Sequence, residues 1–503
     1  MNNVRVIMAE VITVEQLDAI NLKVTADPGV RQEIAEFFSF RPANYQFTPA
    51  YKNKIWDGYI RLYAPMRPVL LVGLIKKLIR FCDDRGYQMD APDHLIHGED
   101  IAEDYGYTIA KEVNCKYEPR PYQNKYIVDA LRDSRSLNLS PTSSGKSLII
   151  YLMQQHYYRK FNHRTLIIVP TISLVHQMEG DFVDYGCDPE AIYKIQGGVD
   201  KTTDKPIVVS TWQSLAKLPK QWFDQFKVVL GDEAHLFQAK SLQKIMGNLP
   251  ECYYRHGFTG TLKTEESKTH QLVLEGCFGS VRQHVTTKDL IDDGTVADFD
   301  VKAIVLSHPT DIRKGFKKAI NKLENSKKFS AEREFLVNCE KRNIFLRNLL
   351  WSLEGQNNLV LFDLVEKHGK LLEPLFEKEG RELHFIHGKV KGEERERIRH
   401  LVENDPEKKH NILASFGTFS TGVNLKRLDN VIFAFGGKSE IKVLQSVGRS
   451  LRKGNGSDKA VLYDITDDLS SGQYTNYTLD HFRKRIDMYG EQQFKMKIFT
   501  VEI

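Results

Sequence analysis

The chain has 503 residues, of which 41% are hydrophobic and 27% charged, and its net charge of +5 means that a polyanion could be bound only by local basic patches. This composition excludes a disordered tail protein and a coiled coil, and the length predicts roughly two to four domains. Six scattered cysteines without a Cys-x-x-Cys pair argue against a zinc ribbon and a disulfide framework, and the longest apolar run, at 69–75, is too short to span a membrane.

Residues 1–97 are rich in aromatic side chains interleaved with cations. The set includes Phe37, Phe38, Phe40, Tyr45, Phe47, Tyr51, Trp56, Tyr59, Tyr63, Arg41, Lys52, Lys54, Arg61 and Arg67. Aromatic platforms beside cations are suited to stacking on unpaired bases and to tracking phosphates. A small domain that uses the same rings for its core would have the same composition. Both interpretations stay open, and each can hold for different residues.

Two later stretches, at about 115–285 and 298–468, alternate apolar β-type runs with helical patterns. This alternation predicts two parallel α/β domains in tandem, with a ligand cleft between them. The strands expected in the first stretch are 165–169, 206–210 and 227–230. Those expected in the second are 358–362, 383–386, 411–415, 430–435 and 459–464.

A serine-rich loop that ends in Gly145-Lys146-Ser147 precedes an expected helix at 148–157, which is the context of a P-loop. Backbone N–H groups and the helix N-terminus would bind phosphates, Lys146 would reach the β- and γ-phosphates, and the Ser147 hydroxyl would bind Mg²⁺. The expected nucleotide-binding residues of the loop are Pro141, Thr142, Ser143, Ser144, Gly145, Lys146 and Ser147. Ser140 and Ser143 replace the glycine or alanine often found in such loops. The alternative for the loop alone is a turn that caps a helix.

Further along, an apolar strand ends in Asp232-Glu233-Ala234-His235. Phosphoryl transfer to water needs a carboxylate for the metal, which fits Asp232, and a group that orients and deprotonates the water, which fits Glu233. A solvated acidic turn is the alternative for this motif alone. The P-loop at the expected distance upstream argues against it.

Asp-Glu-Ala-His after a P-loop resembles motif II of superfamily 2 helicases of the DEAH type, in which His235 would also take part in catalysis. Residues 120–123 resemble the adenine-recognition motif of that family, which implies that Tyr122 stacks on the base and Gln123 bonds to its edge. Residues 169–174, 197–198 and 209–215 resemble segments that contact the nucleic-acid backbone. The contacts that the resemblance implies are from Thr171, Gly198, Ser210 and Thr211.

The remaining family motifs follow in order. Residues 258–261 resemble motif III, which links the ATP site to the strand-binding surface, and 359–362 and 385–388 resemble motifs of the second domain. Residues 420–425 resemble motif V, and the resemblance implies that Gly422 contacts the nucleotide and that Thr418 and Thr421 contact nucleic acid. Residues 445–452 resemble motif VI, with Gln445, Arg449 and Arg452 as catalytic residues. Arginine fingers of this kind increase rates by about 10³–10⁵.

The aromatic segment itself, at 37–40, 45–49 and 56–62, resembles the accessory domain of phage recombination and repair helicases of the UvsW family. This resemblance covers nearly the whole chain. It implies a helicase or translocase, with ATP and Mg²⁺ as cofactors, that unwinds or branch-migrates forks, Holliday junctions, D-loops and R-loops in recombination, repair and replication. The implied partners are branched and single-stranded DNA and RNA–DNA hybrids, contacted in part by Trp56 and Arg61. The resemblance also implies a monomeric motor without a membrane role in the cytoplasm of a bacterial host.

We therefore expect an α/β protein with two tandem RecA-like parallel-sheet domains, at 98–290 and 291–480. A small N-terminal α+β accessory domain at 1–97 would precede them, and a tail at 481–503 would follow. The alternatives are an RNA helicase, a restriction-type translocase on double-stranded DNA, and a strand-annealing protein with a regulatory ATPase. The N-terminal resemblance argues against the first two. A complete set of motor residues argues against the third.

Overall fold

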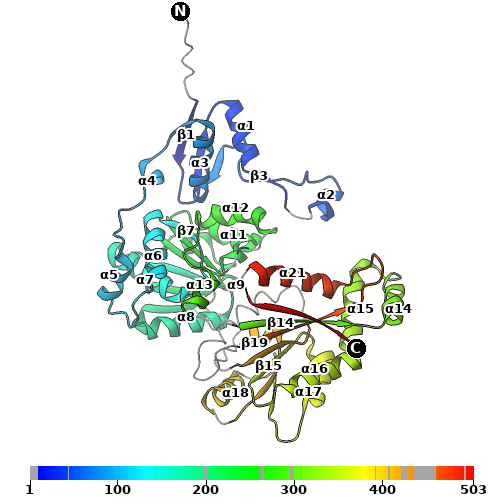
Figure 1. Ribbon diagram of the computed structural model, residues 1–503. Helices are drawn as coiled ribbons and strands as arrows, with labels where there is room; N and C mark the ends of the chain where they lie inside the picture. The colour runs from blue at the N-terminus through cyan, green and yellow to red at the C-terminus, as the bar shows by residue number, and fades with distance from the viewer. Residues whose placement is uncertain are drawn as a thin grey trace, which may run out of the picture. The chain divides into compact units, whose positions relative to one another are not determined.

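The computed structural model describes residues 10–503 except 43–44, 142, 196–201, 261, 263–265, 295–298, 391, 406–407, 421–427, 436–459 and 492–493. The chain divides into two compact units, Met1–Val285 and Thr286–Ile503 (Figure 1). Each unit contains one seven-stranded sheet, and the first also contains a four-stranded sheet. Within the described ranges, no helix is both long and apolar enough to cross a bilayer.

The N-terminal part of the first unit is built on a mixed sheet in the order β5-β2-β1-β6. Its strands are β1 (Val11–Gln16), β2 (Asn21–Thr25), β5 (Val69–Leu71) and β6 (Gln88–Asp90). Alternate residues of β1, including Ile12 and Val14, pack with α1 (Pro28–Phe37) and α3 (Ile75–Arg85), which explains the period-2 burial of this strand. The smaller elements are β3 (Ser39–Phe40), η1 (Tyr45–Phe47), α2 (Pro49–Lys52), β4 (Ile60–Arg61), η2 (Val72–Leu74) and α4 (Asp93–Ile96).

The first seven-stranded sheet has the order β13-β7-β12-β11-β8-β10-β9, and its strand pairs are all parallel. Its strands are β7 (Arg135–Leu139), β8 (Thr165–Val169), β9 (Ile192–Ile195), β10 (Ile207–Thr211), β11 (Val228–Asp232), β12 (Tyr254–Thr259) and β13 (Val281–Arg282). All five residues of β8 are buried, because helices cover both faces of the sheet.

On one face of this sheet, Leu166 and Ile168 pack with residues of α11 and α12. The helical elements of this part are α5 (Tyr105–Glu112), α6 (Pro121–Asp133), α7 (Lys146–Phe161), α8 (Ile172–Asp184), η3 (Pro189–Ala191), α9 (Trp212–Leu215), α10 (Lys220–Phe223), η4 (Ala234–Gln238), α11 (Lys240–Gly247) and α12 (Glu266–Phe278). Helix α7 comes from the crossover that joins β7 to β8, and α8 comes from the one that joins β8 to β9.

The second unit contains a parallel sheet in the order β16-β17-β15-β18-β19-β14-β20. Its strands are β14 (Phe299–Ser307), β15 (Asn358–Phe362), β16 (Leu383–Ile386), β17 (Asn411–Ser415), β18 (Asn430–Phe433), β19 (Ala460–Asp468) and β20 (Met496–Glu502). Its helical elements are α13 (Thr287–Asp292), α14 (Thr310–Ile320), α15 (Asn325–Val337), α16 (Glu340–Ser352), η5 (Val365–Gly369), α17 (Lys370–Phe376), α18 (Gly392–Asn404), α19 (Phe416–Ser420) and α21 (Tyr477–Glu491). One apolar cluster packs α18 and α21 against one face of the sheet, and a second packs α16 and α17 against the other.

The residues expected to form a C-terminal tail are part of this second sheet unit. The expected boundary at 480/481 lies inside α21, whose Phe482 and Tyr489 are buried in the core. Beyond it, β20 pairs in parallel with β14. The expected boundary at 290/291 similarly lies inside α13. An apolar helix face and a strand edge explain why α21 and β20 pack on this sheet.

The predicted fold class is confirmed: two parallel sheets follow a small N-terminal mixed sheet. The strands expected at 165–169, 358–362, 383–386 and 411–415 have the predicted bounds. Those expected at 206–210, 227–230, 430–435 and 459–464 are present with shifted ends, and the expected helix at 148–157 lies within α7.

Candidate active site

Three neighbouring parallel strands place the P-loop, the acidic motif and motif III at the carboxyl ends of the strands of the first seven-stranded sheet. Strand β12 lies between β7 and β11, with Thr259 in register with Leu139 and Phe258 in register with Asp232. The P-loop follows β7, motif III ends β12, and the acidic motif ends β11. The carboxyl ends of parallel strands are the usual ligand edge of such sheets, so this arrangement favours a nucleotide site.

Internal hydrogen bonds and two left-handed backbone positions shape the P-loop. The Ser144 hydroxyl donates to the Pro141 carbonyl at 2.6 Å and lies 2.5 Å from the Ser140 hydroxyl. Gly145 has φ +76° and precedes the first turn of α7, while Ser143 has φ +67°. A left-handed conformation is unfavourable for serine, which explains why glycine is often found at such positions. Thr142 lies outside the described residues.

Lys146 is buried at the start of α7, with 9% of its surface exposed. Its Nζ is 4.0 Å from Glu233 Oε1 and has no hydrogen-bond partner among the described residues. A buried ammonium group is costly without anionic partners. The site is therefore suited to a phosphate group.

The acidic motif is connected to motif III through His235. Asp232 is buried at the end of β11, and Glu233 follows with φ +51°. The His235 Nδ1 lies 3.0 Å from Thr259 Oγ1 and 3.2 Å from Glu233 Oε2. A shift of the acidic motif would therefore be transmitted to the end of β12.

Tyr185 is a contact of the P-loop that the sequence motifs do not indicate. Its hydroxyl lies 2.7 Å from the Ser147 hydroxyl, the group predicted to bind Mg²⁺. Burial raises the pKa of Tyr185 to about 12, so the phenol is neutral at pH 7. Tyr185 follows α8, far from the P-loop in sequence, and only the tertiary structure brings the two hydroxyls together.

Gln123 holds the P-loop from the side of α6. Its Nε2 donates to the Ser144 carbonyl at 2.8 Å, and its Oε1 accepts a 2.8 Å hydrogen bond from the Arg120 backbone N–H. A Cβ atom added to Gly145 would lie 2.3 Å from Gln123 Nε2, so only glycine allows this approach. The neighbouring Tyr122 hydroxyl also donates to Ser144, at 3.1 Å. Both ends of the Gln123 amide are thus engaged by protein, whereas the sequence motif implied a bond to the adenine.

The predicted nucleic-acid contacts of the α/β domains are mostly buried or not described. Three of these residues are buried in this structure: Ser210, Thr211 and Thr418 are only 0%, 4% and 5% exposed. Thr171 is partly exposed, and its hydroxyl accepts a hydrogen bond from the Leu174 N–H at the start of α8. The predicted residues that lie outside the described ranges are Gly198, Thr421, Gly422, Gln445, Arg449 and Arg452.

The N-terminal aromatic residues divide between the core and the surface. Phe38 and Tyr63 are buried in the core. In contrast, the Arg41 guanidinium lies 4.3 Å from the centre of the exposed Tyr59 ring, and the Arg61 guanidinium lies 5.3 Å from it.

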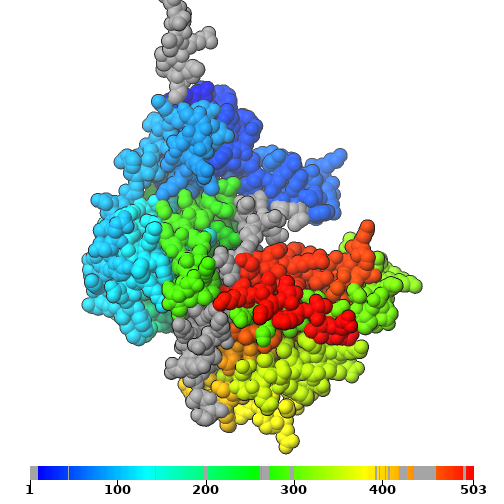
Figure 2. Space-filling view, viewed as in Figure 1, coloured from blue at the N-terminus to red at the C-terminus, as the bar shows by residue number. Residues whose placement is uncertain are grey.

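Other residues complete this surface. Trp56 Nε1 donates to the Tyr59 carbonyl at 2.7 Å, and Arg61 forms an ion pair with Asp57. Phe47 is 65% exposed in the same segment. Figure 2 shows the segment around α2, in blue, at the molecular surface. We call Arg41, Phe47, Trp56, Tyr59 and Arg61 the aromatic surface.

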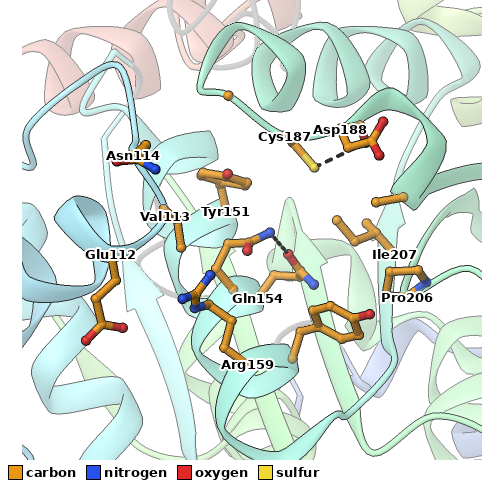
Figure 3. A pocket seen from close by; sticks show the side chains of 14 residues that line it. Glu112, Val113, Asn114, Tyr151, Gln154, Arg159, Cys187, Asp188, Pro206 and Ile207 are labelled. Atoms are coloured by element: carbon orange, nitrogen blue, oxygen red, sulfur yellow. Dashed lines mark hydrogen bonds between the residues drawn. The ribbon is translucent and has the colours of Figure 1, made fainter.

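A separate cavity of about 220 Å³ lies beside α7 and contains none of the predicted site residues. Tyr151, Gln154 and Arg159 line it from α7, and Cys187 and Asp188 line it from the segment after α8 (Figure 3). The Gln154 side chain accepts a 2.9 Å hydrogen bond from Gln155. Chemistry of the P-loop and the acidic motif therefore takes place outside this cavity.

Comparisons with known proteins agree with the motif order. Family models match the N-terminal part of DNA helicase UvsW at residues 11–91, the res subunit of type III restriction enzymes at 116–264, and the conserved helicase C-terminal domain at 340–454. A DNA-bound type ISP restriction-modification enzyme, LlaBIII, has a TM-score of 0.55 at 16% identity, covering 77% of this chain and 32% of that chain, which shows a shared fold.

Similarity to one relative extends over nearly the whole chain. The ATP-dependent DNA helicase uvsW of Enterobacteria phage T4 is 34% identical over 512 aligned positions, which cover 97% of this chain and 98% of the relative. The crystal structure of T4 UvsW has a TM-score of 0.50 and 31% identity, and the match covers 98% of this chain and 99% of that chain. The chain therefore belongs to the UvsW family of ATP-dependent DNA helicases.

Proposed function

We propose that this helicase acts on branched DNA, unwinding or branch-migrating forks, Holliday junctions, D-loops and R-loops in recombination, repair and replication. The observation that carries the proposal is the aromatic surface, which lies within the region similar to the UvsW N-terminal domain. Stacking rings and guanidinium groups bind unpaired bases and phosphates without reading sequence. Such a surface is suited to the single-stranded arms at a branch point.

The proposed ATP hydrolysis takes place at the carboxyl ends of β7, β11 and β12 in the first seven-stranded sheet. Lys146 would bind the β- and γ-phosphates, Glu233 would orient and deprotonate the attacking water, and His235 would hold Glu233 and Thr259 in place. The hydroxyl of Ser147 and the carboxylate of Asp232 are hard oxygen ligands of the kind that Mg²⁺ prefers, and both lie at this end of the sheet. When bound there, Mg²⁺ would neutralise phosphate charge.

Further parts of the proposal rest on the family resemblance. Gln445, Arg449 and Arg452 would stabilise charge on the γ-phosphate, Gly422 would contact the nucleotide, and Thr421 would contact the DNA backbone. Each of the two seven-stranded sheets would form one motor domain, and the accessory domain would precede them in the sequence. The motor would act as a monomer in the bacterial host cytoplasm, since the similar helicase comes from a phage.

The branched-DNA proposal is tested by Arg41→Ala and Tyr59→Ala, with Arg80→Ala as a matched control on the exposed face of α3. Base stacking contributes roughly 1–3 kcal/mol per base, so we expect Tyr59→Ala to slow strand displacement on a four-way junction by about 5- to 150-fold. ATP hydrolysis stimulated by single-stranded DNA should stay within about twofold. Equal loss of both activities, or no loss on the junction, would contradict the proposal.

A second candidate function, translocation on double-stranded DNA without strand separation, is favoured by the match to type III restriction subunits at 116–264. It predicts that linear duplex stimulates ATP hydrolysis as strongly as the junction. A strand-annealing assay tests the remaining alternative, a strand-annealing protein with a regulatory ATPase. If that alternative holds, annealing proceeds in the Lys146→Ala variant.

A further inference from the structure

A compact group of potential metal ligands lies in the second unit, whereas the P-loop and the acidic motif belong to the first. Glu382 and His384 are at the amino end of the edge strand β16, and His410 immediately precedes β17. Sheet hydrogen bonds fix their backbones, since the Asn411 N–H donates to the Glu382 carbonyl at 3.1 Å. The His410 N–H donates to Asn357 Oδ1 at 2.9 Å. The three side chains therefore start from a rigid frame.

The distances between the potential ligand atoms match a tetrahedral metal site. His384 Nε2 lies 3.1 Å from His410 Nδ1, and Glu382 Oε2 lies 3.8 Å and 3.5 Å from these two atoms. Ligands placed about 2.0–2.2 Å from Zn²⁺ at tetrahedral angles are about 3.3–3.6 Å apart. One ion could thus contact all three atoms after shifts of a few tenths of an ångström.

Charge and burial favour the metal-binding state of these groups. The side chains of His384 and His410 are only 12% and 1% exposed, so little water competes with a metal for their ring nitrogens. Lys408 Nζ lies 3.6 Å from Glu382 Oε1, while Glu382 Oε2 is the oxygen that faces the histidines. The Glu382 side chain is 52% exposed and that of His410 only 1%, so a fourth ligand from water would approach from the glutamate side.

We propose that Glu382, His384 and His410 bind one divalent transition-metal ion of the Zn²⁺ class, with water as the fourth ligand. Two imidazoles and one carboxylate favour Zn²⁺, Co²⁺ or Ni²⁺ over Mg²⁺ or Ca²⁺. The ion would join the amino ends of β16 and β17 and so stabilise the edge of the second sheet. The competing explanation for the 3.1 Å contact is a hydrogen bond between two histidines that bind no metal.

The test uses the full chain, treated with chelator and titrated with Co²⁺ and then Zn²⁺ in the absence of ATP. Visible absorption of Co²⁺ reports tetrahedral coordination, and calorimetry gives the stoichiometry and affinity. We expect one Zn²⁺ per chain, with binding at least about tenfold weaker in His384→Ala and Glu382→Gln. His400→Ala, an exposed histidine on α18, is the matched control and should bind like the wild type.

Two further measurements distinguish loss of the metal site from misfolding of a variant. Mg²⁺-dependent ATP hydrolysis shows whether His384→Ala is folded, because the proposed metal site contains no ATP-site residue. Zn²⁺ should raise the melting temperature of the wild type and of His400→Ala but not that of His384→Ala. Equal Zn²⁺ affinity in the wild type and a folded His384→Ala variant, or no stoichiometric binding by the wild type, would overturn the metal site and leave the helicase proposal untouched.

Discussion

Replacement of Gln123 by alanine tests whether this side chain organises the P-loop or reads the base. Its buried amide makes one hydrogen bond to Ser144 and one to Arg120, both 2.8 Å long. Each such bond contributes about 0.5–1.5 kcal/mol, so losing both costs about 1–3 kcal/mol and weakens phosphate binding roughly 5- to 150-fold. Because the bonds hold the loop itself, the loss should not depend on the base.

Calorimetry with the Mg²⁺ complexes of ATP, GTP and inorganic triphosphate measures this directly. We expect Gln123→Ala to weaken all three by similar factors, since triphosphate has no base to recognise. Gln32→Ala, an exposed glutamine on α1, serves as the control and should change none of them. Weaker ATP binding with unchanged triphosphate binding would refute a role of Gln123 in holding the P-loop and would support direct adenine recognition.

Three other substitutions have expected outcomes. Tyr185→Phe removes the hydroxyl 2.7 Å from Ser147 and should lower the Mg²⁺ concentration needed for half-maximal ATP hydrolysis by about 2- to 10-fold, because one competing hydrogen bond is lost; an unchanged Mg²⁺ dependence would contradict this. Burial lowers the pKa of His256 to about 3, so its neutral form stabilises the fold above pH 6.5, and this stability is lost as pH falls toward 3. The difference in unfolding free energy between the wild type and His256→Gln should therefore shrink by about 2 kcal/mol between about pH 7 and 5. A difference that stays constant over this range would be evidence against the prediction. Arg485→Met removes two of the three 2.8 Å hydrogen bonds to the buried Asp464 carboxylate and leaves only that from the Tyr489 hydroxyl. It should destabilise the second unit by about 3–5 kcal/mol in urea unfolding, whereas a loss below about 1 kcal/mol would show that the ion pair is not needed.

The parallel sheets and the order of the motifs could be predicted from sequence for a simple physical reason. Strands buried on both faces, such as β8 and β15, are continuous apolar runs, and the loops at their carboxyl ends carry the motif residues. Lys146, Asp232 and Glu233 come at or just after the carboxyl ends of such strands, which is why they lie at the same end of the sheet.

The contacts around the P-loop could not be predicted, because they depend on residues distant in sequence. Nothing in the local sequence places the Tyr185 hydroxyl against Ser147 or engages both ends of the Gln123 amide. Similarly, the sequence suggests that hydroxyl residues in a motif are available to bind phosphate, yet Ser210 and Thr211 are buried at the end of β10, which is paired on both sides. Sequence spacing identifies such residues but not their exposure.

The N-terminal segment shows the same limit for aromatic residues. Phe37 and Phe38 are adjacent, yet Phe38 is fully buried and Phe37 is 37% exposed. In a short element that packs on one side only, consecutive side chains point in different directions, so composition cannot separate core rings from surface rings. The contact of Arg41 with Tyr59 marks the aromatic surface, and sequence spacing alone does not indicate it.

ATP-driven strand separation on branched DNA is tested most directly by strand displacement on a synthetic four-way junction, comparing the wild type with Lys146→Ala and Glu233→Gln. The wild type should displace strands only with ATP and Mg²⁺, and Glu233→Gln should be slower by about 10²–10⁴ because the proposed general base is lost. Lys146→Ala should show no ATP-dependent displacement. If the junction neither stimulates ATP hydrolysis by the wild type nor is unwound, the branched-DNA function is wrong, and the enzyme's substrate is another form of DNA.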